Sequence, residues 1–483
     1  MLDHLGRVAS VIAAQVRHYD MIAGFSQRRG LLAPCPPGSR EAVEKHDERS
    51  AVLTRLDDMQ IEVMGSPAGF PPAGFEQRGR RHQVPTGRRG HRFCPLHGSA
   101  NFLRHQPVLP TPSCWLGVNR QMYTAPPFAD HRFALVLSGG NALGSFQAGA
   151  WCALEQHGLV PDWIAGASVG AVNGAIICGN PPGERRAALE RLWRPALNNE
   201  MPTFDLKSAE EARRVRSAIS SLAFGQPGLF NPRALYGPWF NPFGNLEPSS
   251  LYDALPLEAT LEKLVDFERL NGGATRYFAT AVDIDTGEDV LFDSAKAHVA
   301  PEHIRASAAL LPVYSPVEIG GRLLGDAGIS INLPLDVVLA QPQDKPLLCI
   351  AIDLLPLRAP RPLNLGETLT RAQDLMFATQ SRRAIAAWQA LFAERARQGD
   401  AASVTLLHLA YANQADEVSL KAFDFSPKSA ARRWRAGFET VDRALEQLSA
   451  PAHALGQPGL AVLAPDDQHR LASVQWGLAP LTG

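Results

Sequence analysis

The chain has 483 residues, of which 45% are hydrophobic and 20% charged, and its formal net charge is -1. This composition is typical of a folded protein with a substantial core, and its charge balance gives no attraction for nucleic acid. The six cysteines are scattered without paired spacing, which disfavours a disulfide framework and favours a reducing compartment. Because no run of about 18 apolar residues is present and no cleavage pattern follows the N-terminal stretch, we expect neither a spanning helix nor a signal peptide.

The first 128 residues differ in pattern from the rest. They are rich in proline, glycine and charge, as in the segment 65–74, and they lack sustained periodicity. We therefore expect an N-terminal extension that is largely disordered. Its potential metal ligands match no common zinc spacing, so we predict no metal site and no cofactor. These ligands are His91, Cys94, His97 and His105.

Regular elements are predicted from residue 133 onward, where a short apolar run indicates a buried strand. Alternating segments then predict further strands, and longer periodic segments predict helices. The predicted strands are 133–137, 163–165, 276–283, 289–292, 347–352 and 404–409; the predicted helices are 146–157, 169–178, 184–194, 208–223, 257–270, 367–398 and 428–449. Strands that alternate with helices predict an α/β sandwich around a mostly parallel sheet.

A glycine-rich turn, Ser138–Gly144, joins the first predicted strand to its helix. Gly139 and Gly140 let the backbone turn sharply, and the helix that follows presents its positive dipole end. Such a turn suits a phosphate or a developing oxyanion. A dinucleotide site is disfavoured, because Ser138 stands where its fingerprint has the first glycine. The alternative, that the turn is a tight strand–helix connection which binds no ligand, is not excluded at this point.

The second strand leads directly into Gly166–Gly170, which matches G-x-S-x-G. In this motif a serine stands on a strained turn between strand and helix with its hydroxyl exposed, and the flanking glycines relieve the crowding. The context of strand, turn and helix makes Ser168 a candidate nucleophile. A serine in a purely structural turn is the alternative.

A later aspartate completes a pattern of separated motifs. Asp326 stands in Gly-Asp-Ala-Gly at the end of an apolar run, after Ala306–Pro312 and before Asn332–Pro334. Together with the glycine turn and the elbow, this order resembles the patatin-like phospholipase family. The resemblance covers about residues 132–345. It implies a three-layer α/β/α patatin-like sandwich with a mostly parallel central sheet, a disordered N-terminal extension and a helical C-terminal extension.

The resemblance also implies a chemistry. Ser168 would attack an ester carbonyl and form an acyl-enzyme, with Asp326 as its base and no histidine in the dyad. Backbone N–H groups of the glycine turn would bind the oxyanion. The implied residues are the oxyanion turn Gly139, Gly140, Asn141 and Gly144, the elbow glycines Gly166 and Gly170, and the aspartate motif Ala327 and Gly328.

Three departures from the family pattern affect these implications. The turn has Asn141 for its third glycine and Leu143 for its usual basic residue, and the aspartate motif has Ala327 for a glycine. Loss of the basic residue weakens the expectation of an anionic head group. Two alternatives remain: an α/β-hydrolase triad of Ser168, Asp326 and His408 in that chain order, and a catalytically silent lipid-binding or scaffold protein.

The sequence thus predicts a lipid acyl-ester hydrolase of the phospholipase A, lysophospholipase or lipase kind. We divide the chain into an extension over 1–128, a catalytic domain over 129–345, an α-rich extension over 346–455 that completes the sheet, and a tail over 456–483. We expect a cytoplasmic protein whose partner is a lipid or another acyl ester. A basic amphipathic segment near Arg433 could contact a membrane surface, and this possibility is left open.

Overall fold

The computed structural model describes residues 130–193, 207–233, 250–449 and 456–476. The expected disordered extension and its four potential metal ligands lie outside these residues. The strands are β1 (Arg132–Leu137), β2 (Trp163–Ala167), β3 (Asn231–Pro232), β4 (Tyr252–Asp253), β5 (Arg276–Asp283), β6 (Asp289–Asp293), β7 (Val317–Ile319), β8 (Arg322–Asp326), β9 (Leu347–Asp353), β10 (Ser403–Ala410), β11 (Gly459–Pro465) and β12 (Leu471–Ser473).

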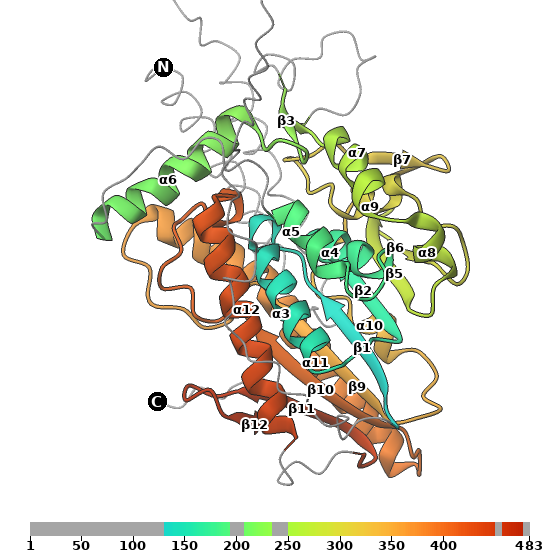
Figure 1. Ribbon diagram of the computed structural model, residues 1–483. Coiled ribbons are helices and arrows are strands. Elements are labelled where there is room, and N and C mark those ends of the chain that lie inside the picture. The colour runs from blue at the N-terminus through green and yellow to red at the C-terminus, as the bar shows by residue number, and fades with distance from the viewer. Residues whose placement is uncertain (1–129, 194–206, 234–249, 450–455, 477–483) are drawn as a thin grey trace, which may run out of the picture. The chain divides into compact units, whose positions relative to one another are not determined.

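The helices show the same alternation with the strands (Figure 1). They are α3 (Ser145–Gln156), α4 (Val169–Cys178), α5 (Arg185–Trp193), α6 (Lys207–Phe224), α7 (Leu255–Leu264), α8 (Phe267–Gly272), α9 (Pro301–Ser307), α10 (Leu335–Leu339), α11 (Leu365–Arg397) and α12 (Pro427–Leu448), with 3-10 turns η2 (Asn141–Gly144), η4 (Ala327–Ile329) and η5 (Lys421–Phe423). In the part of the chain described here, no helix is long and apolar enough to cross a bilayer.

A ten-stranded sheet forms the centre of the fold. Its order is β12-β11-β10-β9-β1-β2-β5-β8-β7, and β6 also pairs with β5. The six strands from β11 to β5 are parallel, whereas β12 at one end and β8, β7 and β6 at the other join by antiparallel pairing. The predicted α/β sandwich with a mostly parallel central sheet is therefore confirmed.

Both faces of the sheet are covered, which gives three layers. Side chains of β1 alternate between two cores, with Leu135 and Leu137 on one face and Ala134 and Val136 on the other. The first core contains residues of α3, α4 and α12, and the second contains residues of α10 and α11. Strands buried on both faces read as continuous apolar runs, which is why the sequence pattern identified them.

Most predicted elements are present within a few residues of their predicted ends. The predicted helix over 257–270 is wrong, because the structure has two helices there, α7 and α8. Asp266 causes the break: its carboxylate caps α8 by accepting a hydrogen bond of 3.1 Å from the Arg269 N–H. Residues treated as a tail contribute β11 and β12, the last two strands at one end of the sheet.

Helices α3 and α12 pack backbone against backbone at two glycines. A Cβ atom at Gly149 would lie 1.8 Å from the Trp434 carbonyl oxygen, and one at Gly437 would lie 1.9 Å from that of Phe146. Any larger residue would force the helices apart, because neither contact can yield by a side-chain rotation. This close packing fixes α12, and with it Arg433, relative to the first helix of the sandwich.

The register of the sheet places Ser168 and Asp326 at the same end of nearby strands. Ala167 at the end of β2 pairs with Thr280 of β5. The next residue of β5, Ala281, pairs with Asp326 at the end of β8. Ser168 follows β2 directly, so it and Asp326 are separated in the sheet by one strand only.

Candidate active site

Ser168 stands on a strained turn between β2 and α4. Its backbone angles are φ 53° and ψ -126°, which a residue with a side chain rarely adopts. A Cβ atom at Gly166 would lie 2.4 Å from the Gly170 backbone, and one at Gly170 would lie 2.2 Å from the Leu137 carbonyl oxygen. The G-x-S-x-G spacing is thus a steric requirement of this turn.

The serine turn is held by a side chain from α9. The Ser168 N–H donates a hydrogen bond of 3.1 Å to the Ser307 hydroxyl oxygen. Ser307 belongs to the Ala306–Pro312 motif, whose role the sequence left undefined. In the structure this motif has a role, because the Ser307 hydroxyl accepts the backbone N–H of Ser168, the candidate nucleophile.

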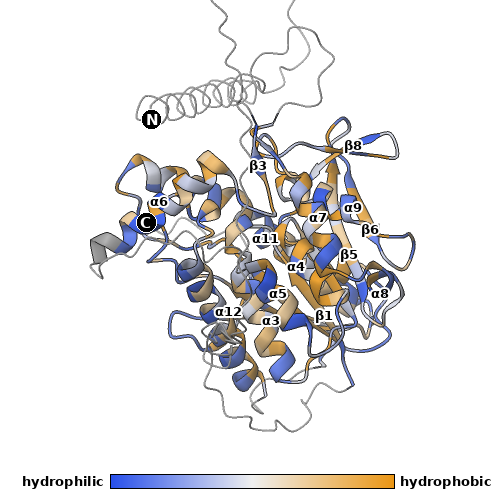
Figure 2. Cartoon of the chain, turned by 45° about the horizontal axis from the view of Figure 1, so that its top comes forward, coloured by the Kyte–Doolittle hydropathy of each residue, from blue (hydrophilic) through white to orange (hydrophobic). Residues whose placement is uncertain are grey.

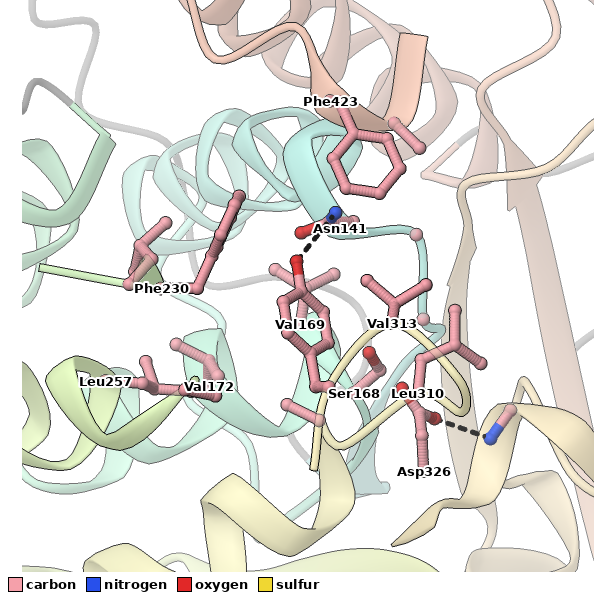
Figure 3. Close-up of a pocket in the computed structure, with 18 of the residues that line it drawn as sticks. Asn141, Ser168, Val169, Val172, Phe230, Leu257, Leu310, Val313, Asp326 and Phe423 are labelled. Atoms are coloured by element: carbon pink, nitrogen blue, oxygen red, sulfur yellow. Dashed lines mark hydrogen bonds between the residues drawn. The ribbon is translucent and has the colours of Figure 1, made fainter. Parts of the chain in front are cut away.

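Asp326 faces Ser168 from the end of β8 (Figure 3). Its side chain is 2% exposed. One carboxylate oxygen accepts a hydrogen bond of 2.7 Å from the Gly328 N–H. The Ser168 side chain lies beside the carboxylate, close enough to affect its ionisation, with no residue between the two (Figure 3).

Burial governs the ionisation of Asp326. The loss of hydration raises its pKa from 3.8 to about 6, although the nearby Ser168 side chain and the hydrogen bond from the Gly328 backbone act in the opposite direction. A carboxylate with a pKa near 6 is a stronger base than a solvated aspartate, yet it is still mostly ionised at neutral pH.

The glycine-rich turn lies beside Ser168 and differs in one respect from its predicted role. The Gly139 N–H donates a hydrogen bond of 3.0 Å to the Asn332 carbonyl, so it is not free to bind an oxyanion. Gly139 is instead required for space, since a Cβ atom there would lie 2.5 Å from Asn332 Oδ1 and 3.0 Å from Ser168 Cβ. The prediction of Gly139 as a donor is corrected accordingly.

Two other N–H groups of this turn have no partner in the described residues, those of Gly140 and Asn141. Asn141 adopts a left-handed conformation with φ 51°, which asparagine tolerates better than most residues. Its side-chain amide donates a hydrogen bond of 3.3 Å to the Tyr314 hydroxyl (Figure 3). Asn141 thus stands where the family has a glycine, and its side chain ties the turn to Tyr314.

A cavity of about 150 Å³ opens on these groups. Ser168, Asp326, Gly140 and Asn141 line it, and so do many apolar side chains. Seven of the apolar ones are labelled in Figure 3: Val169, Val172, Phe230, Leu257, Leu310, Val313 and Phe423. An apolar cavity with a few convergent polar groups is the usual form of a site for a small or chain-like organic ligand.

Comparison with known families agrees with this geometry. Residues 135–339 match the model of the patatin-like phospholipases, and residues 379–453 match a second model described as patatin phospholipase. The chain belongs to the patatin-like phospholipase family. No curated protein matches the sequence.

Two solved structures show distant likeness to this patatin-like protein. VipD from Legionella pneumophila is 11% identical with a TM-score of 0.31, over 66% of this chain and 67% of that one. The ExoU–SpcU complex of Pseudomonas aeruginosa is 12% identical with a TM-score of 0.23, over 68% of this chain and 56% of that one. Likeness at this level transfers no property from either protein.

His408, the third member of the alternative triad, lies elsewhere in this patatin-like protein. It is buried in β10, where its Nε2 atom is 3.4 Å from an Asp353 carboxylate oxygen and its ring packs edge-on against Trp476. It does not line the cavity that holds Ser168 and Asp326. The triad interpretation is therefore wrong, because a matching chain order did not bring the three side chains together.

We expect His408→Gln to retain hydrolysis of a p-nitrophenyl ester within about twofold of wild type, because the histidine is remote from the cavity. Steady-state kinetics, with circular dichroism to confirm folding, would check this. A folded His408→Gln protein with no activity would restore the triad.

The segment after residue 345 also contributes side chains to the cavity. Phe377 and Gln373 of α11 line it, as do Lys421, Phe423 and Phe425. Lys421 brings a positive charge, but both oxygens of Asp374 accept its ammonium hydrogens, at 2.6 and 2.8 Å. Sequence reasoning missed these residues, since no local pattern marks them as part of a site.

The basic segment of α12 that left membrane contact open lies only partly on the surface. Arg433, at the centre of the segment that suggested membrane contact, is fully buried. The helix lies against α3 and turns its most basic stretch partly inward. Figures 1 and 2 both show α12 and α3 side by side.

Proposed function

We propose that the protein hydrolyses carboxylic esters of lipids through a dyad of Ser168 and Asp326. Family membership supports lipid acyl hydrolysis as the general activity. The observation that carries the dyad is that a serine on a strained elbow and a buried carboxylate lie side by side in one apolar cavity. Nucleophile and base within hydrogen-bond reach is the expected arrangement for nucleophilic catalysis.

The first half-reaction transfers the acyl group to the enzyme. Ser168 Oγ attacks the ester carbonyl carbon while its proton passes to the Asp326 carboxylate. The carbonyl oxygen becomes an oxyanion, which accepts hydrogen bonds from the N–H groups of Gly140 and Asn141. The tetrahedral intermediate then collapses, the bond to the alcohol breaks, and the alcohol oxygen takes the proton from Asp326.

The second half-reaction releases the acid. Asp326, ionised again, takes a proton from water, and the resulting hydroxide attacks the acyl carbonyl. The second tetrahedral intermediate uses the same two N–H groups. Its collapse breaks the bond to Ser168 Oγ, which recovers the proton from Asp326. Both steps require Asp326 to be ionised at their start.

The lining of the cavity indicates which part of the substrate enters. Lys421 is the one cationic side chain among the described lining residues, and Asp374 neutralises it. Leu143, where the family has a basic residue, is fully buried. We therefore propose that the cavity receives the apolar acyl chain and that the alcohol or head group stays outside it.

A direct test is to treat the purified protein with a fluorophosphonate probe, which captures activated serines, and to map the adduct by mass spectrometry. We expect one adduct, on Ser168, and hydrolysis of at least one class in a panel of phospholipids, lysophospholipids and p-nitrophenyl esters. A folded protein that neither labels at Ser168 nor cleaves any of these esters would support the silent alternative.

We also propose that an apolar rim beside the cavity rests on a lipid surface. The rim consists of Ile329, Leu365, Leu369, Met376 and Leu420, with exposures of 49%, 70%, 39%, 62% and 38%. The three residues on α11 share one face of the helix, next to the cavity-lining Gln373 and Phe377.

Two hydrogen bonds hold the rest of the rim in place. The Thr370 hydroxyl donates a bond of 2.6 Å to the Ser419 carbonyl, beside Leu420. The Gln380 amide donates one of 3.1 Å to the Gly328 carbonyl, beside Ile329. Exposed apolar side chains around the mouth of an apolar cavity favour contact with the surface from which a lipid is drawn.

For this rim we expect Leu365→Glu/Met376→Glu to weaken binding to phosphatidylcholine vesicles at least about tenfold, since two apolar side chains no longer enter the lipid. Vesicle sedimentation would measure it. Leu391→Glu is the matched control, because Leu391 is also exposed on α11 but lies four turns further along the helix. Equal loss in the control would contradict the rim.

A further inference from the structure

Arg433 of α12 is fully buried and uses every hydrogen-bond donor that it has. Its Nε and Nη2 atoms donate to the two carboxylate oxygens of Glu417, at 2.9 and 2.7 Å. The remaining three N–H bonds go to backbone carbonyls. A guanidinium has five N–H groups, so this arrangement leaves none unsatisfied.

The three carbonyls belong to two different walls of the cavity. One is that of Ala142 in η2, at 3.0 Å from Nη1. The other two, those of Asp424 at 2.8 Å and Lys421 at 3.1 Å, border η5. Arg433 therefore ties the candidate oxyanion turn to the C-terminal segment that lines the cavity with Lys421.

The contact with Ala142 leads on to the oxyanion donors. The Ala142 carbonyl shares its peptide group with the N–H of Leu143, which donates a hydrogen bond of 3.2 Å to the Gly140 carbonyl. That carbonyl in turn shares its peptide group with the N–H of Asn141. A cation at the start of such a chain polarises each peptide group and strengthens the next hydrogen bond, by roughly 10–30% per bond.

We propose that Arg433 is a positioning residue for the oxyanion turn, which it holds and polarises through Ala142 and Leu143. The inference rests on the proposed function, because it presumes that the Asn141 N–H binds an oxyanion. It gives the C-terminal segment a role in the reaction itself: α12 completes a turn that begins at the end of β1, about 290 residues earlier in the chain.

The charges around Arg433 keep it cationic. Although burial alone would raise the pKa of Glu417, the neighbouring Arg433 and Arg432 lower it to about 2, so the carboxylate is ionised. Tyr411 also donates a hydrogen bond of 2.8 Å to Glu417, and Arg432 donates another of 2.8 Å. Arg432 thus shares the acidic partner of Arg433, but its hydrogen bonds go to Glu417 and the Asp416 carbonyl and not to the turn.

This difference supplies a matched control. We would compare the full-length wild type with Arg433→Lys, Arg433→Met/Glu417→Gln and Arg432→Met. The double variant removes both buried charges together, because loss of Arg433 alone would leave the buried Glu417 carboxylate only partly neutralised, by Arg432, and would destabilise the protein. Arg433→Lys keeps the charge and loses the planar fork, so it remains informative if the double variant does not fold.

We expect kcat to fall about 100-fold in the double variant and about tenfold in Arg433→Lys, with KM within about twofold of wild type. Arg432→Met should keep kcat within about twofold. If Arg433 had a purely structural role, its variants would have a lower melting temperature, but kcat would not fall while KM stays unchanged. A folded Arg433 variant with the wild-type kcat, or an equal loss in Arg432→Met, would overturn the inference.

The controls also separate this inference from the proposed function. If wild type hydrolyses esters and Ser168→Ala does not, the dyad holds, and the Arg433 variants decide the role of α12 alone. If wild type cleaves nothing and Ser168 never labels, the proposed function fails first, and the role of Arg433 falls with it.

Discussion

Replacing Ser168 with alanine is expected to lower ester hydrolysis at least about 10³-fold while the protein stays folded. The substitution removes the one atom that attacks the carbonyl and leaves Cβ, the strained turn and the hydrogen bond from its N–H to Ser307 in place. Initial rates on a p-nitrophenyl ester would measure the loss, and fluorophosphonate labelling should disappear with it.

A second buried serine provides the control. Ser403 lies at the start of β10, is 5% exposed and makes no hydrogen bond through its hydroxyl within the described residues. Ser403→Ala should therefore keep both the rate and the labelling of wild type. Hydrolysis by Ser168→Ala at the wild-type rate would refute the proposed nucleophile, whatever the family of the protein.

Replacing Asp326 with asparagine is expected to lower kcat/KM about 10²–10⁴-fold, the usual contribution of a general base. The amide is close to the carboxylate in size and keeps an acceptor for the Gly328 N–H. Asp353→Asn, a buried aspartate of β9 beside His408, is the matched control and should leave the rate unchanged.

The pH dependence of wild type should report the same residue. Because burial raises the pKa of Asp326 to about 6, the base is protonated and inactive below this pH and ionised above it. We expect kcat/KM to rise tenfold per pH unit well below 6 and to level off above about 7. A profile that stays flat down to pH 4 would contradict the assignment.

The same shift predicts an effect of opposite sign on stability. The folded protein holds the proton of Asp326 more tightly than the unfolded chain does, so ionisation above pH 6 costs about 3 kcal/mol of folding free energy. Asp326→Asn removes this cost. We expect the inactive variant to melt at a higher temperature than wild type at pH 8, and to lose that advantage near pH 4.

The sequence was sufficient for features that depend on neighbouring residues. An apolar run followed by a glycine turn, and a serine between two glycines, are local requirements of a buried strand and of a strained elbow. Both appear where they were predicted, at β1 and at Ser168. Asp326 was assigned by resemblance alone, and only the register of β2, β5 and β8 explains its place.

Other features depend on residues far apart in the chain, and the sequence could not supply them. The Gly139 N–H is occupied by a carbonyl about 190 residues later, so no property of the turn itself marks it as unavailable. His408 was suggested by chain order, which does not specify which core a strand residue faces. Arg433 was interpreted as part of a basic surface because a buried arginine and an exposed one look alike in sequence.

The position of β1 in the sheet has a consequence for biosynthesis. This strand lies between β2, which follows it closely, and β9, which leaves the ribosome more than 200 residues later. Until β9 and α12 have been translated, one edge of β1 is unpaired and the glycine turn lacks its arginine. A nascent chain therefore carries Ser168, the proposed nucleophile, long before the oxyanion turn is complete, so a fragment truncated before α12 should hydrolyse no lipid.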